Sequence, residues 1–181
     1  MTYTLEQFCA DCRRTLSEHP GSDGRERVRD LLERLLANRE FVEATLGPDA
    51  TPGRHALYED PELGFVVLAH VNNDAHESPP HDHGTSWAVY GQAKEWTDMT
   101  EWRRTDEGDD EGVELEPVRT YRLEPGKAGL YDVGAIHSIH YPAGARFVRV
   151  TGRDLDQVPR TKYDLAAHRA VRIESASAGR A

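Results

Sequence analysis

The stretch that decides the fold is "PPHDHGTSWAVYG", Pro79 to Gly91, which places two histidines in the order His-x-His before an alternating run. On a β-strand, residues i and i+2 point to the same face. His81 and His83 therefore offer two imidazoles to one point in space. Two neutral imidazoles on one face either fill a polar pocket or hold a metal ion. The pair alone leaves both interpretations open.

A second stretch, "GLYDVGAIHSIHYPAG", supplies two more imidazoles, His137 and His140. Catalytic metal sites tend to keep three protein ligands and leave positions open for other molecules. We therefore expect a divalent metal ion at His81, His83 and His137. His140 stands three residues further on, where a strand would turn it to the opposite face. We expect it to act as a supporting or pocket residue rather than as a ligand.

The middle of the chain reads as a series of short strands separated by glycine- and proline-rich turns. The expected strands cover residues 64–71, 85–96, 118–123, 128–134 and 146–152. An acidic, glycine-bearing stretch at 103–117 is expected to be a solvated hairpin tip. Many short strands after a helical N-terminus indicate a mostly β (α+β) fold, either a sandwich or a barrel. In a barrel, alternate positions face the lumen, so a His-x-His pair could line a pocket.

The rest of the chain frames this β region. Residues 1–50 are expected to form a helical cover of the same domain, residues 51–160 the barrel, and 161–181 a partly disordered tail. Apolar residues at helical spacing support two helices, the second capped by Ser22 or Asp23 with Glu26 three positions on. The tail is expected to carry a short helix at 163–173, followed by disorder at 174–181.

Composition narrows the possible partners. The 181 residues suggest one domain, and the net charge of −10 argues against nucleic acid or an anionic membrane as a partner. No apolar run is long enough for a transmembrane helix and no secretory signal is visible, so the expected location is the cytoplasm. Cys9 and Cys12 share a helical apolar face, which favours core packing over a metal or redox role.

Two stretches resemble the two motifs of the cupin family. "HDHGTSWAVYGQAKEW" resembles the first motif through His81, His83 and Gly91. "PGKAGLYDVGAIHSIHYP" resembles the second motif, with Pro125, Gly126, Gly134 and His137 at the motif positions. The resemblance covers about residues 50 to 155 and implies a cupin double-stranded β-helix barrel with N-terminal helices.

The motif glutamate that follows the His-x-His pair in many cupins is absent, and Trp87 and Ala88 stand in its place. This resembles the thiol dioxygenase branch, that is cysteine dioxygenase and 3-mercaptopropionate dioxygenase, in which three histidines hold iron. The branch also implies that Arg54 binds a substrate carboxylate. The outer histidine and tyrosine of that branch are replaced, because the matching strand reads Phe147, Arg149 and Thr151.

The resemblance implies an iron(II)-dependent cupin dioxygenase acting on dioxygen and a small anionic substrate, as a monomer or homodimer. Arg54 and Arg149 are the candidates for gripping the anion, and Tyr131 and His140 are further candidate catalytic residues. Each arginine could equally be a structural or outward-facing residue, and Tyr131 could be barrel packing. Alternatives are an isomerase or lyase using zinc, manganese or nickel, and a cupin that binds a small ligand without turnover.

Overall fold

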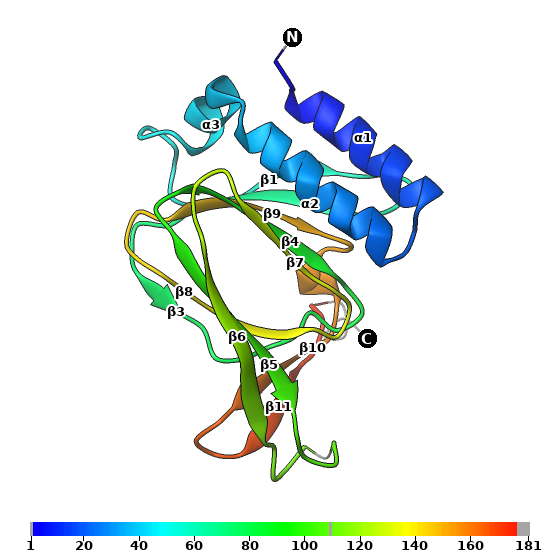
Figure 1. Cartoon of the computed structure of the whole chain (residues 1–181), viewed down its shortest axis with the longest axis vertical. Helices are drawn as coiled ribbons and strands as arrows, with labels where there is room; N and C mark the ends of the chain where they lie inside the picture. The colour runs from blue at the N-terminus through cyan, green and yellow to red at the C-terminus, as the bar shows by residue number, and fades with distance from the viewer. Residues whose placement is uncertain (1, 109, 177–181) are drawn as a thin grey trace.

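The computed structural model describes residues 2–108 and 110–176, which form a β-barrel with a layer of helices on one side (Figure 1). The helices of the described part are α1 (Leu5–Glu18), α2 (Ser22–Leu36) and α3 (Arg39–Leu46). The strands are β1 (Gly53–Glu59), β2 (Val66–Val71), β3 (His76–Glu77), β4 (Ala88–Lys94), β5 (Thr97–Arg104), β6 (Leu115–Leu123), β7 (Ala128–Tyr131), β8 (Ile136–Tyr141), β9 (Arg146–Thr151), β10 (Arg160–Asp164) and β11 (Arg169–Ile173). None of the described helices has both the length and the apolar character needed to cross a bilayer.

Two antiparallel sheets make up the barrel. One has the strand order β1-β2-β9-β4-β7 and the other β3-β8-β5-β6. Apart from the consecutive pairs β1–β2 and β5–β6, neighbouring strands are far apart in sequence, and the chain passes repeatedly between the sheets, as in a jelly roll of two Greek keys. This confirms the mostly β, double-stranded β-helix fold predicted from the sequence. The sequence-based strands missed β1, β5 and β8, because polar and charged residues alternate irregularly there.

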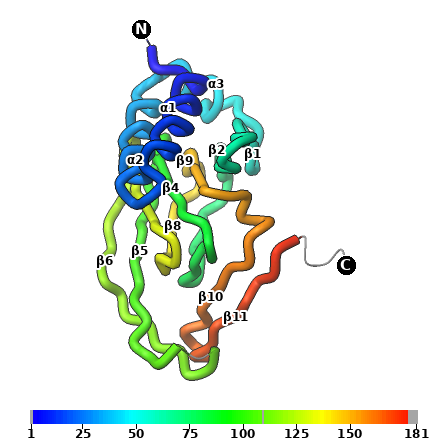
Figure 2. Tube along the Cα trace, turned by 90° about the vertical axis from the view of Figure 1, so that its right-hand side faces the viewer, coloured from blue at the N-terminus to red at the C-terminus, as the bar shows by residue number. Residues whose placement is uncertain are grey.

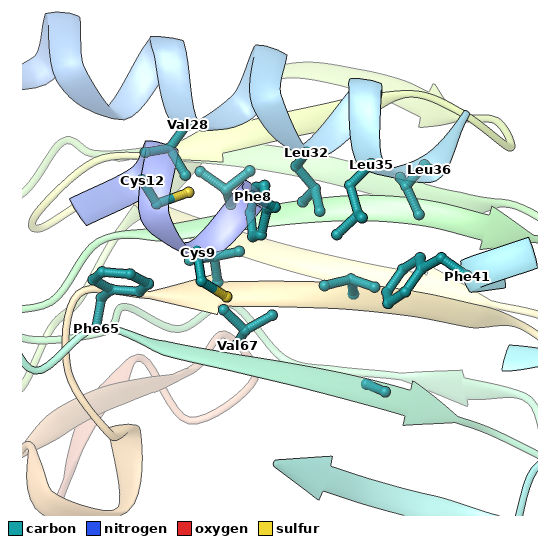
Figure 3. Close-up of a cluster of buried hydrophobic side chains, with 14 of the residues drawn as sticks. Phe8, Cys9, Cys12, Val28, Leu32, Leu35, Leu36, Phe41, Phe65 and Val67 are labelled. Carbon is teal, nitrogen blue, oxygen red and sulfur yellow. The ribbon is translucent and has the colours of Figure 1, made fainter. Parts of the chain in front are cut away.

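Helices α1 and α2 pack on the outer face of the five-stranded sheet and bury an apolar layer (Figure 3). Phe8, Leu32 and Leu35 are fully buried in it, and Cys9 and Cys12 are free, buried thiols there, as predicted. Burial raises the pKa of Cys9 to about 11, so this thiol stays protonated and unreactive at neutral pH.

The apolar layer depends on one close approach between helix and sheet. A Cβ atom on Gly91 of β4 would lie 2.7 Å from side-chain carbons of Leu32 and Leu36. The first-motif glycine therefore lets α2 sit directly on β4. Because β4 is covered by α2 on one face and faces the barrel on the other, its first five residues are all buried.

The structure corrects the predicted start and number of the helices. Residues 2–46 hold three helices, not two, because Asn38 caps a separate α3 through its side chain. Neither Ser22 nor Asp23 caps α2, whose N-cap is Gly21 without a side-chain bond. The Ser22 hydroxyl donates instead to Asp132, at 2.7 Å, and so ties the start of α2 to the turn after β7.

The predicted C-terminal helix over 163–173 is wrong. These residues form most of the hairpin β10–β11, whose turn lies at Leu165–His168. The hairpin meets the tip of the β5–β6 hairpin at the end of the molecule away from the helices (Figure 2). Val113 and Tyr163 are buried at this contact, so the acidic tip is not fully solvated. The predicted disorder at 174–181 falls mainly on residues 177–181, which lie outside the described residues.

Candidate metal centre

Backbone pairing brings His81 and His137 together. The amide of each residue donates to the carbonyl of the other, both at 2.9 Å, in an antiparallel bridge. In such a hydrogen-bonded pair the two side chains lie on the same face of the sheet. The register of two distant segments thus places the second-motif histidine beside the first of the His-x-His pair.

The turn after His81 fixes the position of His83. The Asp82 carboxylate accepts from the amides of Gly84, at 2.9 Å, and Thr161, at 3.0 Å. Gly84 has a φ of +57°, and a Cβ atom there would lie 2.0 Å from the Pro159 carbonyl oxygen. The "HDHG" sequence therefore needs its glycine so that the loop can close against the segment before β10.

The three imidazoles form one compact group. The ring centroids of His81 and His137 are 4.5 Å apart, those of His83 and His137 4.8 Å, and those of His81 and His83 5.4 Å. Each ring offers a nitrogen within 4.8 Å of the others. His83 and His137 are buried and His81 is half-buried. These are the three ligands expected from the sequence, and the fold brings them to one point.

The donor set fits a divalent metal ion. Among the described residues, neither ring nitrogen of His137 has a hydrogen-bond partner of normal geometry, although the ring is fully buried. Such orphaned buried nitrogens are costly unless another group satisfies them. Burial lowers the pKa of all three histidines, and their mutual repulsion together with Arg149 lowers the pKa values of His83 and His137 further, so the rings are neutral ligands.

Aromatic residues hold the group from one side. The ring of Tyr131 stacks on His137 with centroids 4.0 Å apart, and its hydroxyl pairs with that of Tyr121 at 2.7 Å. Tyr131 is fully buried and does not line the cavity, so it acts as support for His137. Tyr90 does line the cavity, and its hydroxyl lies 3.5 Å from Nε2 of His83.

The histidine group opens onto a small cavity of about 270 Å³. His81 and His83 line it, together with apolar residues such as Phe147 and Tyr141. Arg54 and Arg149, the two predicted anion-binding residues, also line it. Arg54 is largely exposed and pairs with Asp156 at 3.4 Å. Arg149 is half-buried, and its buried Nε has no partner among the described residues.

Three cavity residues were not selected from the sequence. His70 was noted only as able to point into the barrel; it is 8% exposed, stacks on Phe147 at 4.5 Å, and its Nε2 has no hydrogen-bond partner. Burial, with the charges of Arg149 and Arg54, keeps the pKa of His70 well below its usual range. Arg160 and Lys162 come from β10. Their alternation would have marked them, had the tail been interpreted as a strand.

His140 does not join the site. Its side chain is exposed, and its ring lies against Trp96, with centroids 5.4 Å apart. It is not among the residues that line the cavity. The period of two along β8 explains this position, because residues 137 and 140 face opposite ways. His140 therefore offers a matched control for experiments on the three clustered histidines.

No carboxylate or cysteine of the described residues joins the three histidines. Ala88, which replaces the motif glutamate, faces the barrel interior between Tyr131 and Thr151 of the neighbouring strands. A methyl group therefore occupies the position from which a carboxylate could reach the imidazoles.

Neither a protein-family model nor a curated protein matches the sequence. Among solved structures, the Schizosaccharomyces pombe Cnp3 cupin domain is similar at 12% identity, over 61% of this chain and 68% of that one, with a TM-score of 0.45. A cupin superfamily protein from Desulfitobacterium hafniense DCB-2 is similar at 14% identity, over 59% and 84%, with a TM-score of 0.42. KdgF from Halomonas sp. is similar at 14% identity, over 54% and 74%, with a TM-score of 0.41. These values are low, so the fold assignment rests on the strand order of the two sheets.

The two sheets and the three-imidazole group together define a barrel of the cupin fold with a site that could hold a metal ion. Within that class, the three clustered side chains are all histidines, and Ala88 stands where the cupin motif would place a carboxylate.

Proposed function

We propose that this chain is a mononuclear metal-dependent cupin enzyme, with iron(II) as its metal and with dioxygen and a small anionic molecule as its substrates. The observation that carries the proposal is one cavity wall with two chemistries. Three neutral imidazoles converge beside the cavity, which His81 and His83 line, and the buried Nε of Arg149, another lining residue, has no partner among the described residues. The first suits a metal ion, and the second suits an anion that replaces the missing partner.

His81, His83 and His137 would hold the ion. Iron(II) bound by three neutral imidazoles would supply the activation of dioxygen, with open positions for the substrate. The protein's own contribution is binding and orientation. Arg149 would grip an oxyanion of the substrate close to the histidines, and Arg54 would contact the substrate from the more exposed side of the cavity.

His70 supplies a buried cavity-lining imidazole outside the metal group, and its Nε2 has no hydrogen-bond partner among the described residues. Because the imidazole is neutral at pH 7, Nε2 can accept a proton or a hydrogen bond from a polar group of the substrate. The stacked ring of Phe147 holds its plane in place. Phe147, Tyr141 and Ile139 give the cavity apolar walls, which exclude water from the space beside these polar groups.

Thiol carboxylic acids are the first substrates to test, because the ligand set resembles the thiol dioxygenase branch. The replacement of that branch's outer histidine and tyrosine by Arg149 and Thr151 means that His70 would have to take over any proton-holding role. We also propose that the protein acts in the cytoplasm, the location expected from its sequence.

The test is oxygen uptake by tag-free protein loaded separately with iron(II), zinc, manganese or nickel, over a panel of small thiols and organic acids. We expect uptake only with iron(II) and only with anionic members of the panel. Turnover with zinc, manganese or nickel and without oxygen would overturn the dioxygenase in favour of an isomerase or lyase. Saturable binding of a panel compound without turnover, whichever of the four metals is loaded, would indicate a non-enzymatic ligand-binding cupin instead.

A further inference from the structure

The cavity wall carries four cationic side chains. Arg54 comes from β1, Arg149 from β9, and Arg160 and Lys162 from β10. Residues 160 and 162 alternate along β10, so both point to the same side of that strand. Among the described residues, no aspartate or glutamate lines this cavity. A protein whose net charge is −10 thus gathers positive charge at one place.

One carboxylate lies close enough to offset part of this charge. Asp156 approaches Arg54 at 3.4 Å and Arg160 at 4.0 Å, and about half of its side chain is exposed. Both distances are long for charge-assisted hydrogen bonds, which are usually below 3 Å. Within the described chain, Arg149 and Lys162 form no ion pair. Four cations less one carboxylate leave about three positive charges, before any metal ion is counted.

The cations lie at two depths. Arg149 is the inner one, since its Nε is buried and its charge acts on the pKa values of His70, His81, His83 and His137. Arg54 and Lys162 are exposed, and the side chain of Arg160 is 26% exposed. The outer set is therefore at the rim, and Asp156 bridges two of its members.

We propose that the rim forms a second anion subsite, so that the substrate is a small dianion with one oxyanion at Arg149 and the other between Arg54 and Arg160. This inference rests on the proposed function, because it names the substrate class of the same site. Asp156 occupies the rim loosely in the absence of the second oxyanion and competes with it.

The space between the two subsites suits a short spacer. Phe147, Tyr141 and Leu155 line the same cavity as the four cations, and its volume of about 270 Å³ lies at the small end for ligand pockets. A few methylene groups would contact these walls while the oxyanions reach the two depths. The second oxyanion can be a carboxylate, a phosphonate or a sulfonate, since each presents oxygens that accept from a guanidinium.

The C-terminal hairpin thereby acquires a role in recognition. Arg160 donates to the Leu155 carbonyl at 2.6 Å, which fixes its guanidinium at the rim. Residues 80–82 pair with β10 through the bridge between His81 and Lys162. The strand that supplies two of the three outer cations is therefore joined directly to the segment that supplies the first histidine.

The experiment compares succinate and 3-phosphonopropionate, two dianions, with butyrate, a monoanion of similar length. Binding is measured by isothermal titration on the full chain, both metal-free and loaded with zinc as a redox-inert ion. We expect both dianions to bind at least about fivefold more tightly than butyrate, the fold-change given by an exposed ion pair of good geometry. A preference for only one dianion assigns the second oxyanion as carboxylate or phosphonate.

Two substitutions with opposite expected signs test the charges. Arg160→Gln should bring the dianion affinity to within about twofold of the butyrate affinity and leave butyrate binding unchanged. Asp156→Asn should tighten dianion binding about threefold, because it removes the competing carboxylate. Arg172→Gln is the matched control: it removes the same charge from the same hairpin, but its side chain is 71% exposed and pairs only with Glu174.

Equal binding of dianions and butyrate by the wild type would overturn the second subsite. So would a dianion preference that survives Arg160→Gln, or one that Arg172→Gln removes to the same extent. These outcomes are distinguishable from failure of the proposed function, which is read from metal content and oxygen uptake. A chain that binds metal but does not prefer dianions keeps the proposed function and loses this inference.

Discussion

The layer between the helices and the sheet and the interior of the barrel are built on opposite principles. The helix layer is apolar throughout, with residues such as Phe8, Leu32 and Val67 fully buried. Seven buried side-chain nitrogen and oxygen atoms lack a partner among the described residues, and five of them lie in the barrel interior, on His70, His137, Arg149 and Thr151. An unsatisfied buried polar atom costs about 1–3 kcal/mol. The barrel therefore lowers stability at its site, and the helix layer supplies the compensation.

This contrast between the two regions separates the residues that stabilise the fold from those that could bind a metal ion or a substrate. A cavity in the helix layer should cost stability and leave binding intact. Removal of a polar side chain from the barrel interior should weaken binding and leave the stability of the fold intact. Substitutions in the two regions test whether stability and binding are separate in this way.

Phe8→Ala should reduce the free energy of unfolding by about 4 kcal/mol, the usual cost of deleting a buried phenylalanine ring. Phe8 is fully buried between α1 and the sheet (Figure 3). Urea denaturation measures the loss, and the metal content of the folded fraction should not change. Leu63→Ala is the control, since Leu63 is 40% exposed, and should shift stability by less than about 0.5 kcal/mol. A metal content that falls with Phe8→Ala would show that the helix layer also determines metal binding, against the expected separation.

Arg149→Ala should weaken kcat/KM for an anionic substrate by about 3 kcal/mol, because it removes a partly desolvated guanidinium. Arg54→Ala should cost only about 1 kcal/mol, because its side chain is 55% exposed and solvent screens it. Steady-state kinetics on the substrate found by the oxygen-uptake panel gives both values. Arg103→Ala, on the outer hairpin and 69% exposed, is the control. If both cavity variants keep wild-type values, neither arginine binds substrate.

Asp60→Asn should destabilise the fold by about 2 kcal/mol at pH 7, because a neutral amide accepts weaker hydrogen bonds than the buried carboxylate and loses the ion pair with Arg13. Asp60 accepts from Arg13 of α1 at 2.7 Å and from the amide of Leu63 at 2.8 Å. Burial opposes the charge, but these bonds together lower the pKa of Asp60. A lowered pKa gives stability that is complete above the unfolded value of about 3.9 and is lost as pH falls through the folded value.

The difference between wild type and Asp60→Asn should therefore shrink between pH 7 and pH 3, as measured by urea unfolding at both values. Glu62→Gln is the matched control, because Glu62 pairs with the same Arg13 at 3.3 Å but is 68% exposed. A Glu62→Gln effect as large as that of Asp60→Asn would show that surface charge, not the buried contact, joins α1 to the β1–β2 turn.

His137→Leu should leave the metal-free protein as stable as the wild type or more stable by about 1 kcal/mol, since an apolar side chain replaces an unsatisfied imidazole. Leucine keeps the contact with the Tyr131 ring. Thermal unfolding in the presence of a chelator measures this effect. A loss above about 2 kcal/mol would mean that His137 stabilises the fold by itself.

Much of this arrangement was predictable from the sequence. The His-x-His spacing and the glycine-flanked His137 predict the three-histidine group. His83 does not lie on a strand, however: it lies in the turn after the isolated bridge at His81, and the hydrogen bonds of Asp82 fix that turn. The apolar spacing around Cys9 and Cys12 likewise predicts the buried face of the first helix. These signals are local or follow from one repeated rule.

What could not be predicted depends on long-range pairing. The segment "YDLAAHRAVRI" has helix-forming alanines, but pairing with residues 80–82 and 110–113 makes it part of a hairpin. That error hid Arg160 and Lys162 from the candidate residues. His70 was hard to select because a buried strand shows no polarity pattern that tells its lumen face from its helix face.

The most direct test of the account is the metal content of the tag-free protein after loading with iron(II) or zinc and dialysis. The account predicts about one ion per chain, and a reduction of at least about tenfold in affinity for His81→Ala, His83→Ala and His137→Ala. His140→Ala, which removes an exposed imidazole from the same strand as His137, should retain full occupancy. Full metal content in His81→Ala, or an equal loss in His140→Ala, would contradict the three-histidine centre.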